Sequence, residues 1–265
     1  MTVLRHTFGS SYFAFAIGGE YRDPTDPRGR SDKFCGIQLM GLKKHTFGNL
    51  PVWSSVEWKF LRRLIKGDHP GAIEGRNKCK RRTDGLGIAE FDGQSALTYW
   101  RGEYFVYARA NPRESGYRAV QVCRGQLDSF GAFQLCQFKG VPAASDIYFL
   151  HPYVIPGDGY IAVIMSMVWA DGHPSDPGIY LALSKDGVKF ERPELLHSCK
   201  AHARRAYDLP IQGNVSFTKS GIELFVHQNV PCRMPERDLK SHPEKLVRVT
   251  KALEPHICAL WTRRP

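Results

Sequence analysis

The feature that most constrains the fold is a long hairpin that occurs three times along the chain, each time led by an aspartate. The hairpins begin at Asp92, Asp146 and Asp208, and the glycines at their turns are 57 and 62 residues apart: Gly102, Gly159 and Gly221. A second hairpin follows the first two, starting at Tyr117 and Gly178. A four-stranded unit therefore recurs at about 60 residues, which is the signature of a repeat architecture.

Glycine and proline interrupt the sequence too often for long helices, since the 265 residues include 25 glycines and 17 prolines. Aromatic and β-branched runs bounded by Gly, Pro, Asp or Ser predict strands instead. These predicted strands are Ala96–Trp100, Tyr104–Arg109, Ala119–Cys123, Phe133–Phe138, Tyr160–Val168, Ile179–Ser184, Val215–Thr218 and Glu223–His227. The chain is therefore expected to be all-β.

Four units can be counted, because a degenerate one precedes the three good ones, with a second hairpin formed by Cys35–Leu42 and Trp53–Ile65. Four-stranded antiparallel units at this spacing predict the blades of a β-propeller, arranged around a central channel. Leu246–Trp261 would supply outer strands to the last blade or close the ring. A β-sandwich is the alternative for many short strands, but the matched spacing favours the propeller.

The length suits one such domain. At about 60 residues a blade, the 265 residues hold four to five blades and nothing else, so residues 1–265 are expected to form a single propeller. Two stretches fall outside the repeat: a basic, glycine-rich connector at 66–87 and a polar segment at 231–245. Both are expected to be long surface loops.

The seven cysteines favour a reducing environment, because they are odd in number, scattered and without a C-x-x-C pair. Tyr12–Ile17 is too short an apolar patch for a secretory signal and is predicted to be a strand. We expect an intracellular, reducing compartment, with the organelle, or secretion by another route, left open.

Cations near Cys79 and Cys199 in the sequence would lower the pKa of these thiols. The apolar runs fall short of the roughly 20 residues of a membrane span.

Positive charge dominates, with 37 Lys and Arg against 26 Asp and Glu and a net charge of +11. Its densest run lies in the 66–87 connector and contains Arg76, Lys78, Lys80, Arg81 and Arg82. Such a cluster binds polyanions through counterion release. The expected partner of this loop is an acidic protein or a polyanion, and a solvated basic loop is the alternative.

Three phrases carry a resemblance to a known family: FDGQSALTYWRGEYFVYARAN from Phe91, LDSFGAFQL from Leu127 and SKDGVKFERPELL from Ser184. Together they resemble the five-bladed propeller superfamily of glycosidases that includes arabinanases, xylosidases, fructosidases and levansucrases, and within it uncharacterised members with an FDG-x-x-S-L opening. The resemblance implies five blades and a carbohydrate bound at the central channel. Related glycosidases use a Glu as general acid on a middle blade, where this chain has Asp146.

The leading aspartates are the candidate catalytic residues. In a propeller the innermost strands line the channel, so Asp92, Asp146 and Asp208 would converge at one mouth. Hydrolysis of a glycosidic bond needs two carboxyl groups flanking that bond. Glu90 lies two residues before Asp92, on the same face of an extended strand, and could contribute as well. The alternative is that each aspartate only caps backbone N–H groups at a strand start.

Aromatic and histidine side chains complete the predicted binding site. Trp100 and Trp169 are candidate stacking surfaces for sugar rings, and Tyr148, His151 and His227 are expected near the carboxylates. The histidines form no H-x-x-x-H or H-E-x-x-H motif, so we expect no metal and no cofactor.

Two functions from different classes follow. The first is a glycoside-hydrolase-like propeller that binds and, if active, hydrolyses a carbohydrate at the channel; whether it is an enzyme stays open. The alternative is a non-catalytic propeller that serves as a binding or structural subunit of a larger assembly through its basic face.

Overall fold

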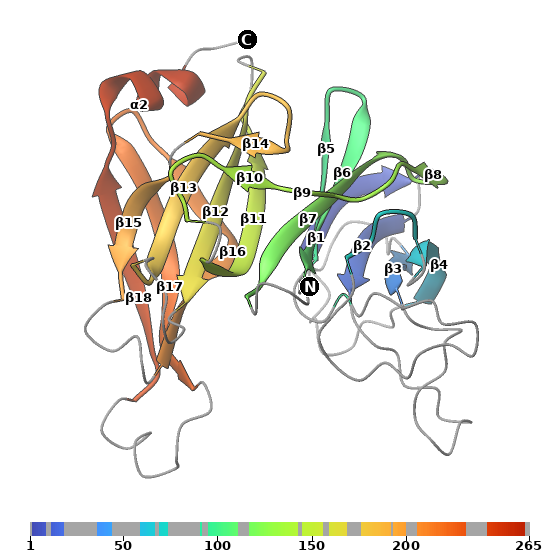
Figure 1. Ribbon diagram of the computed structural model, residues 1–265, viewed down its shortest axis with the longest axis horizontal. Coiled ribbons are helices and arrows are strands. Elements are labelled where there is room, and N and C mark those ends of the chain that lie inside the picture. The colour runs from blue at the N-terminus through green and yellow to red at the C-terminus, as the bar shows by residue number, and fades with distance from the viewer. Residues whose placement is uncertain are drawn as a thin grey trace.

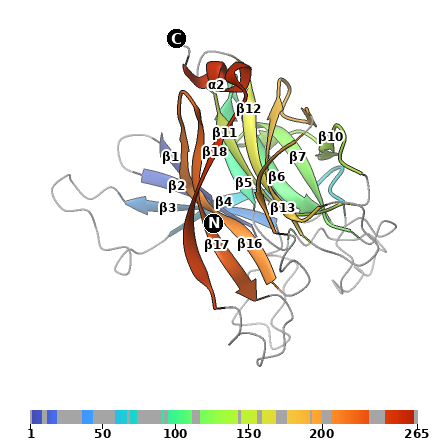
Figure 2. The same ribbon diagram turned by 90° about the vertical axis from the view of Figure 1, so that its left-hand side faces the viewer.

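The part of the chain that the structure describes folds into four β-sheets that follow one another along the sequence (Figures 1 and 2). The computed structural model describes residues 2–8, 12–18, 36–43, 59–66, 69–73, 91, 95–110, 117–142, 145–155, 159–168, 176–191, 193–199, 206–231 and 243–262. Within these residues the one helix is the short α2 (Pro255–Thr262), and no helix there is long and apolar enough to cross a membrane. The expectation of an all-β chain is confirmed.

Each sheet is built largely from one continuous stretch of chain, and we name the sheets A to D in sequence order. Sheet A contains β1 (Thr2–Phe8), β2 (Tyr12–Gly18), β3 (Gly36–Lys43) and β4 (Lys59–Lys66). Sheet B contains β5 (Ala96–Trp100), β6 (Glu103–Ala110), β7 (Ala119–Gln126), β8 (Ser129–Phe130) and β9 (Gln134–Leu135).

Sheet C is the largest. It contains β10 (Gln137–Phe138), β11 (Asp146–Val154), β12 (Ile161–Val168), β13 (Gly178–Ser184), β14 (Lys189–Phe190) and β15 (Glu194–Ser198). Sheet D contains β16 (Ala206–Phe217), β17 (Gly221–Pro231) and β18 (Lys245–Ala252). β18 is the outer strand that the C-terminal segment was expected to supply.

The hairpin between β5 and β6 shows how the sequence fixes a turn. Trp100 pairs with Glu103, which leaves Arg101 and Gly102 as a two-residue loop. Both loop residues have positive φ, 51° at Arg101 and 82° at Gly102. This is the backbone of the turn that matches the right-handed twist of paired strands, and glycine adopts it without strain.

One predicted strand is divided between two sheets. The prediction placed a single strand at Phe133–Phe138, but β9 pairs with β7 of sheet B while β10 pairs in parallel with β14 of sheet C. Cys136, between them, donates its backbone N–H to the carbonyl of Val120 in sheet B, and Gln137 donates its N–H to the carbonyl of Val188, just before β14 of sheet C. This segment therefore crosses from one sheet to the next.

Apolar side chains pack between successive sheets rather than in one central core. One cluster joins Ile37 and Ile65 of sheet A to sheet B. A second joins sheets B and C, and a third joins sheets C and D together with α2. β12 serves two clusters, since Met165 faces sheet B and Ile164 faces sheet D, as the two-residue period of a strand requires.

These features are those of propeller blades. In each sheet most strands pair in chain order, and β5 of sheet B contacts both β1 of sheet A and β11 of sheet C. The prediction of a β-propeller with antiparallel sheets is confirmed, but among the described residues only sheet A has four strands, and sheet C includes one parallel pair, β10 with β14. Four sheets are seen in the described residues, and the fifth blade is not confirmed. The predicted connectors at 66–87 and 231–245 lie mostly outside the described residues.

Candidate functional site

The predicted aspartates of sheets C and D lie at the same end of their sheets, which we call the strand-start end. Asp146 is the first residue of β11 and pairs with Val168 at the end of β12. Two residues from Val168, the Ser166 hydroxyl donates to the backbone carbonyl of Asp208 at 3.1 Å. β16 contacts β12 and β13, so Asp208 lies beside the end of β12 that pairs with the start of β11.

Asp146 binds an arginine of the preceding sheet. Its Oδ1 accepts the backbone N–H of Arg118 at 3.1 Å, and its Oδ2 accepts the Arg118 guanidinium at 3.2 Å. The carboxylate side chain is 10% exposed and the arginine 25%. Since Arg118 lies just before β7, this ion pair fastens sheet C to sheet B.

Tyr148 lies beside this ion pair, among cationic groups. The guanidinium carbons of Arg109 and Arg118 lie 4.6 and 4.8 Å from the centre of its ring. A cation at this distance is attracted by the negative face of the aromatic ring. Tyr148 is half-buried. This part of the strand-start end combines a carboxylate, two guanidinium groups and a phenol.

Asp208 is completely buried and bonded on both oxygens. Its Oδ2 accepts the Nε2–H of His197 at 2.8 Å, and its Oδ1 accepts the backbone N–H of Asn229 at 3.0 Å. The side-chain amide of Gln228 lies 3.5 Å from Oδ2. His197 belongs to β15 of sheet C, so Asp208 fastens sheet D to sheet C, as Asp146 fastens sheet C to sheet B.

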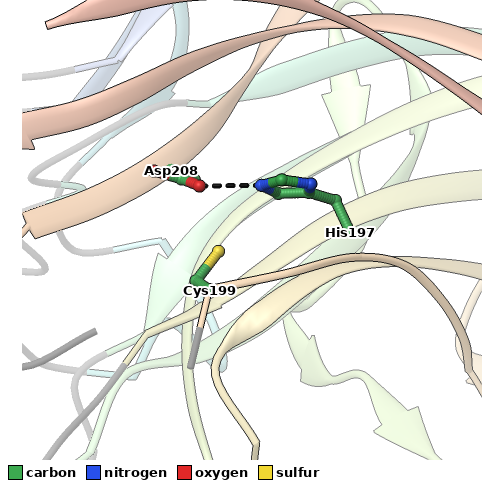
Figure 3. Close-up of side chains that lie close together, drawn as sticks. All are labelled: His197, Cys199 and Asp208. Atoms are coloured by element: carbon green, nitrogen blue, oxygen red, sulfur yellow. Dashed lines mark hydrogen bonds and ion pairs between the residues drawn. The ribbon is translucent and has the colours of Figure 1, made fainter. Parts of the chain in front are cut away.

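Cys199 completes a compact group with His197 and Asp208 (Figure 3). The imidazole, thiol and carboxylate atoms of the three residues lie within 4.8 Å of one another. Burial raises the pKa of the Cys199 thiol, and the Asp208 charge raises it further. The expected lowering of this pKa by neighbouring cations is wrong, because the thiol faces a carboxylate. A protonated thiol is a weak nucleophile.

Both described aspartates thus partly fit the capping alternative, since each accepts a backbone N–H. The donors are Arg118, just before β7, and Asn229, on β17, and neither lies in the turn beside its aspartate. The leading aspartate of a unit therefore bonds across to another element, and both carboxylates also accept a side-chain donor of the preceding sheet.

The other predicted neighbours take different places. His151 lies in the middle of β11, and its burial lowers the pKa of the imidazole from 6.5 to about 4. His227 lies on β17, where its Nε2 is 2.6 Å from Glu244 and its side chain is 42% exposed. Neither belongs to the group around Asp208.

Trp100 lies at the opposite end of the sheets. Its prediction as a stacking surface for sugar rings is wrong. It ends β5, and Arg101 beside it donates to the carbonyl of Gly159 at the turn between β11 and β12. The indole is 5% exposed, packs against Phe105 and has the Arg101 guanidinium over its ring. Its ring faces are already covered by protein, so a sugar cannot stack on them.

Several predicted site residues lie outside the described residues. They are Asp92, Glu90 and Trp169, together with the basic run Arg76, Lys78, Lys80, Arg81 and Arg82.

Sequence reasoning did not place His197 and Cys199 in the site. Their spacing held the signal, because residues two apart on an extended chain face the same side. Gln228 and Asn229 reach Asp208 only through the pairing of β16 with β17, which the sequence does not reveal.

Two of the hollows among the described residues can be compared with the positions of the aspartates. A cavity of about 10 Å³ is lined by Arg109, Tyr148 and Ile147, among others, at the junction of sheets B and C. A cavity of about 440 Å³ lies between β10 and β14, lined by Lys139, Lys189 and their neighbours. The larger one is remote from the aspartates, because it lies toward the hairpin-turn end of sheet C.

Comparison with known proteins finds no protein-family model that matches the chain and no similar curated protein. Solved structures resemble its fold at low sequence identity. A Bombyx mori GH32 β-fructofuranosidase is 8% identical, with a TM-score of 0.49, over 93% of this chain and 45% of that protein. An exo-1,5-α-L-arabinanase from a bovine ruminal metagenomic library is 12% identical, with a TM-score of 0.47, over 92% and 71%. An N-acetylgalactosamine deacetylase from F. plautii, solved with blood group B trisaccharide, is 10% identical, with a TM-score of 0.44, over 97% and 77%.

Proposed function

We propose that the protein binds a carbohydrate at the strand-start end of its sheets. The observation that carries the proposal is that Asp146, at the start of β11, and Asp208, near the start of β16, lie at the same end of two neighbouring sheets. In a propeller the innermost strands line the channel, so groups at this end face one mouth.

The groups around Asp146 suit a sugar. Carboxylate and guanidinium groups accept and donate hydrogen bonds to hydroxyls, and a half-buried phenol offers both an apolar ring and a polar tip. Asp146, Arg118 and Tyr148 supply these groups close together at the junction of sheets B and C.

The two described aspartates take different parts in this proposal. Asp146, whose side chain is 10% exposed, would contact the sugar, whereas the fully buried Asp208 would act as a positioning residue through His197. Hydrolysis needs a second carboxyl group on the other side of the glycosidic bond. Asp92 is our candidate for it, because it leads the preceding unit in the sequence.

Binding can be tested with a panel of plant, algal and fructan-type glycans and with isothermal titration. We expect the wild-type chain to bind at least one of them, and Asp146→Asn and Tyr148→Ala each to weaken that binding at least 10-fold. Glu191→Gln is the matched control, since this carboxylate is 71% exposed and lies toward the opposite end of sheet C. Circular dichroism shows whether each variant is folded.

The proposal fails if no glycan of the panel binds, or if Asp146→Asn and Tyr148→Ala, both folded, bind as the control does. Hydrolysis is tested separately by product analysis of the glycan that binds. If the chain cleaves it, Asp92→Asn and Asp146→Asn should each lower turnover by 100-fold or more, the scale of a lost acid or base.

A further inference from the structure

We propose that His197, Cys199 and Asp208 form a zinc-binding site that joins sheet C to sheet D. The three side chains come from two elements, β15 with the residue after it and β16, and point toward one another (Figure 3). Their donor atoms, a ring nitrogen, a sulfur and a carboxylate oxygen, lie within 4.8 Å of one another. The inference does not depend on glycan binding.

The spacing of the donors suits a zinc ion. Zn–N and Zn–O bonds are about 2.0–2.2 Å long and Zn–S bonds about 2.3 Å, so ligand atoms around one tetrahedral ion are about 3–4 Å apart. His197 Nε2 and Asp208 Oδ2 are 2.8 Å apart, somewhat nearer than two ligand atoms of one such ion. Small rotations of the side chains, without movement of the strands, would open this distance enough to admit the ion.

The charge of the site also fits a divalent cation. Cys199 is buried and the Asp208 side chain is fully buried, so an unbalanced charge there is costly. On binding, the thiol gives its proton to solvent, and the thiolate and carboxylate together cancel the two positive charges of zinc. The His197 proton moves to Nδ1, which frees Nε2 to bind the metal.

The kinds of donor select among cations. Calcium and magnesium prefer sites made of oxygen ligands, whereas a thiolate with an imidazole favours zinc. Three protein ligands leave a fourth position. The Gln228 side-chain amide lies 3.2 Å from His197 Nε2 and 3.5 Å from Asp208 Oδ2, close enough to reach it or to hold a water there.

The site is held in place before any metal arrives. Asp208 accepts the backbone N–H of Asn229, and its own carbonyl accepts the Ser166 hydroxyl of β12. Cys199 donates its backbone N–H to the carbonyl of Pro177, beside the start of β13. A zinc ion would therefore tie together strands whose positions are already fixed, which lowers the entropy cost of binding.

Cobalt(II) serves as the spectroscopic probe for the full chain, because a bound thiolate gives an intense near-ultraviolet band and a tetrahedral site gives visible bands. We expect both bands to appear, to saturate at one equivalent and to disappear when zinc is added. Cys199→Ser should remove the near-ultraviolet band. The matched control is Cys136→Ser, another free cysteine among the described residues, and it should keep the band.

His197→Ala provides a second, independent variant at a residue whose side chain is 19% exposed. It should raise the zinc Kd at least 100-fold, since loss of a group that only hydrogen-bonds a metal ligand already lowers metal affinity 10- to 100-fold. Zinc at about 100 times its Kd should raise the Tm of the wild-type chain by about 5 °C or more, and a chelator should reverse this.

The assignment is overturned if the wild-type chain shows no cobalt–thiolate band, or if the band persists in Cys199→Ser. Circular dichroism checks that each variant is folded. If Cys199→Ser does not fold, His197→Ala decides: a folded variant that binds zinc as tightly as the wild-type chain also overturns the assignment.

Discussion

Sheets C and D differ in how much of their surface is covered. Every residue of β12, in sheet C, is buried, because sheet B packs on one side of it and sheet D on the other. In β17, of sheet D, Ile222, Leu224 and Val226 are buried, but Glu223 and Phe225 between them are only half-buried. One sheet is an inner layer, and the other has a single covered face among the described residues.

The two sequences already differ in this way. IAVIMSMV, in β12, is apolar almost throughout, whereas the β17 segment IELFVHQ places Glu223, His227 and Gln228 among its apolar residues. A continuous apolar strand predicts a blade covered on both faces, and interruption by polar residues predicts a blade with a more open face. The residue pattern within a blade therefore reports its neighbours as well as its own strands.

Alanine substitutions of apolar residues in β12 and β17 should give the largest changes in the free energy of unfolding. We expect Ile164→Ala and Met165→Ala each to lower the free energy of unfolding by about 3–4 kcal/mol, since both leave cavities in close-packed surroundings. In β17, Leu224→Ala should cost about 3 kcal/mol and Phe225→Ala about 1 kcal/mol. Urea unfolding measures all four. If Phe225→Ala costs as much as Leu224→Ala, the outer face of sheet D is covered and the comparison fails.

Acid should lower the free energy of unfolding because of a buried histidine in sheet C. His151 has its pKa lowered to about 4 by burial, against 6.5 in an exposed site. The unfolded chain takes up this proton first, so the stabilisation from neutral His151 is complete above about pH 6.5 and is lost as the pH falls toward 4. The loss is about 3 kcal/mol.

His151→Gln should remove that part of the pH dependence, measured by urea unfolding between pH 4 and 7. His227→Gln, at a 42% exposed histidine of sheet D, is the matched substitution. Equal pH profiles of His151→Gln and the wild-type chain would contradict this prediction.

Asp146 and Asp208 each link two neighbouring sheets, and loss of the more deeply buried carboxylate should lower the free energy of unfolding more. Asp208→Asn should cost about 2 kcal/mol, because the new amide can turn only one oxygen toward the two donors that now bond the two carboxylate oxygens, His197 and the Asn229 backbone. Asp146→Asn should cost about 1 kcal/mol, since its partner Arg118 is 25% exposed. Urea unfolding in metal-free buffer gives both values. A larger loss for Asp146→Asn would reverse the ranking of the two junctions.

The smallest effect is expected on the open face of sheet D. Arg248 lies 2.9 Å from Glu223, but its side chain is 64% exposed. Such pairs contribute little because water screens them, so Arg248→Ala should change the free energy of unfolding by less than about 0.5 kcal/mol. A loss above about 1 kcal/mol would show that this face is shielded from water.

The fold was predictable where local chemistry decides it. The hairpin at Arg101 and Gly102, the strand at Ala96–Trp100 and the outer strand near the C-terminus all follow from turn residues and residue alternation. The division of the Phe133–Phe138 segment between two sheets at Cys136 was not predictable, because the hydrogen-bond partners of that segment come from two different sheets.

The candidate site was predictable only in part, for a similar reason. The repeat spacing identified Asp146 and Asp208, and their position at one end of the sheets follows from the unit order. Their partners Arg118 and His197 depend on how one sheet packs against the next, and no local pattern encodes that distance. The side-chain partners that bind an aspartate here lie 28 and 11 residues away in sequence.

The crossing of the chain from sheet B to sheet C at Cys136 also affects how a blade could be added by duplication of a gene segment. Residues 145–199 hold the main strands of sheet C, but its outer strand β10 comes from upstream, in the stretch that also supplies β9 to sheet B. A duplicated segment with those bounds would insert a sheet without its outermost strand. A copy that starts before Gln137 would carry that strand along, so the unit of duplication and the visible blade have different boundaries.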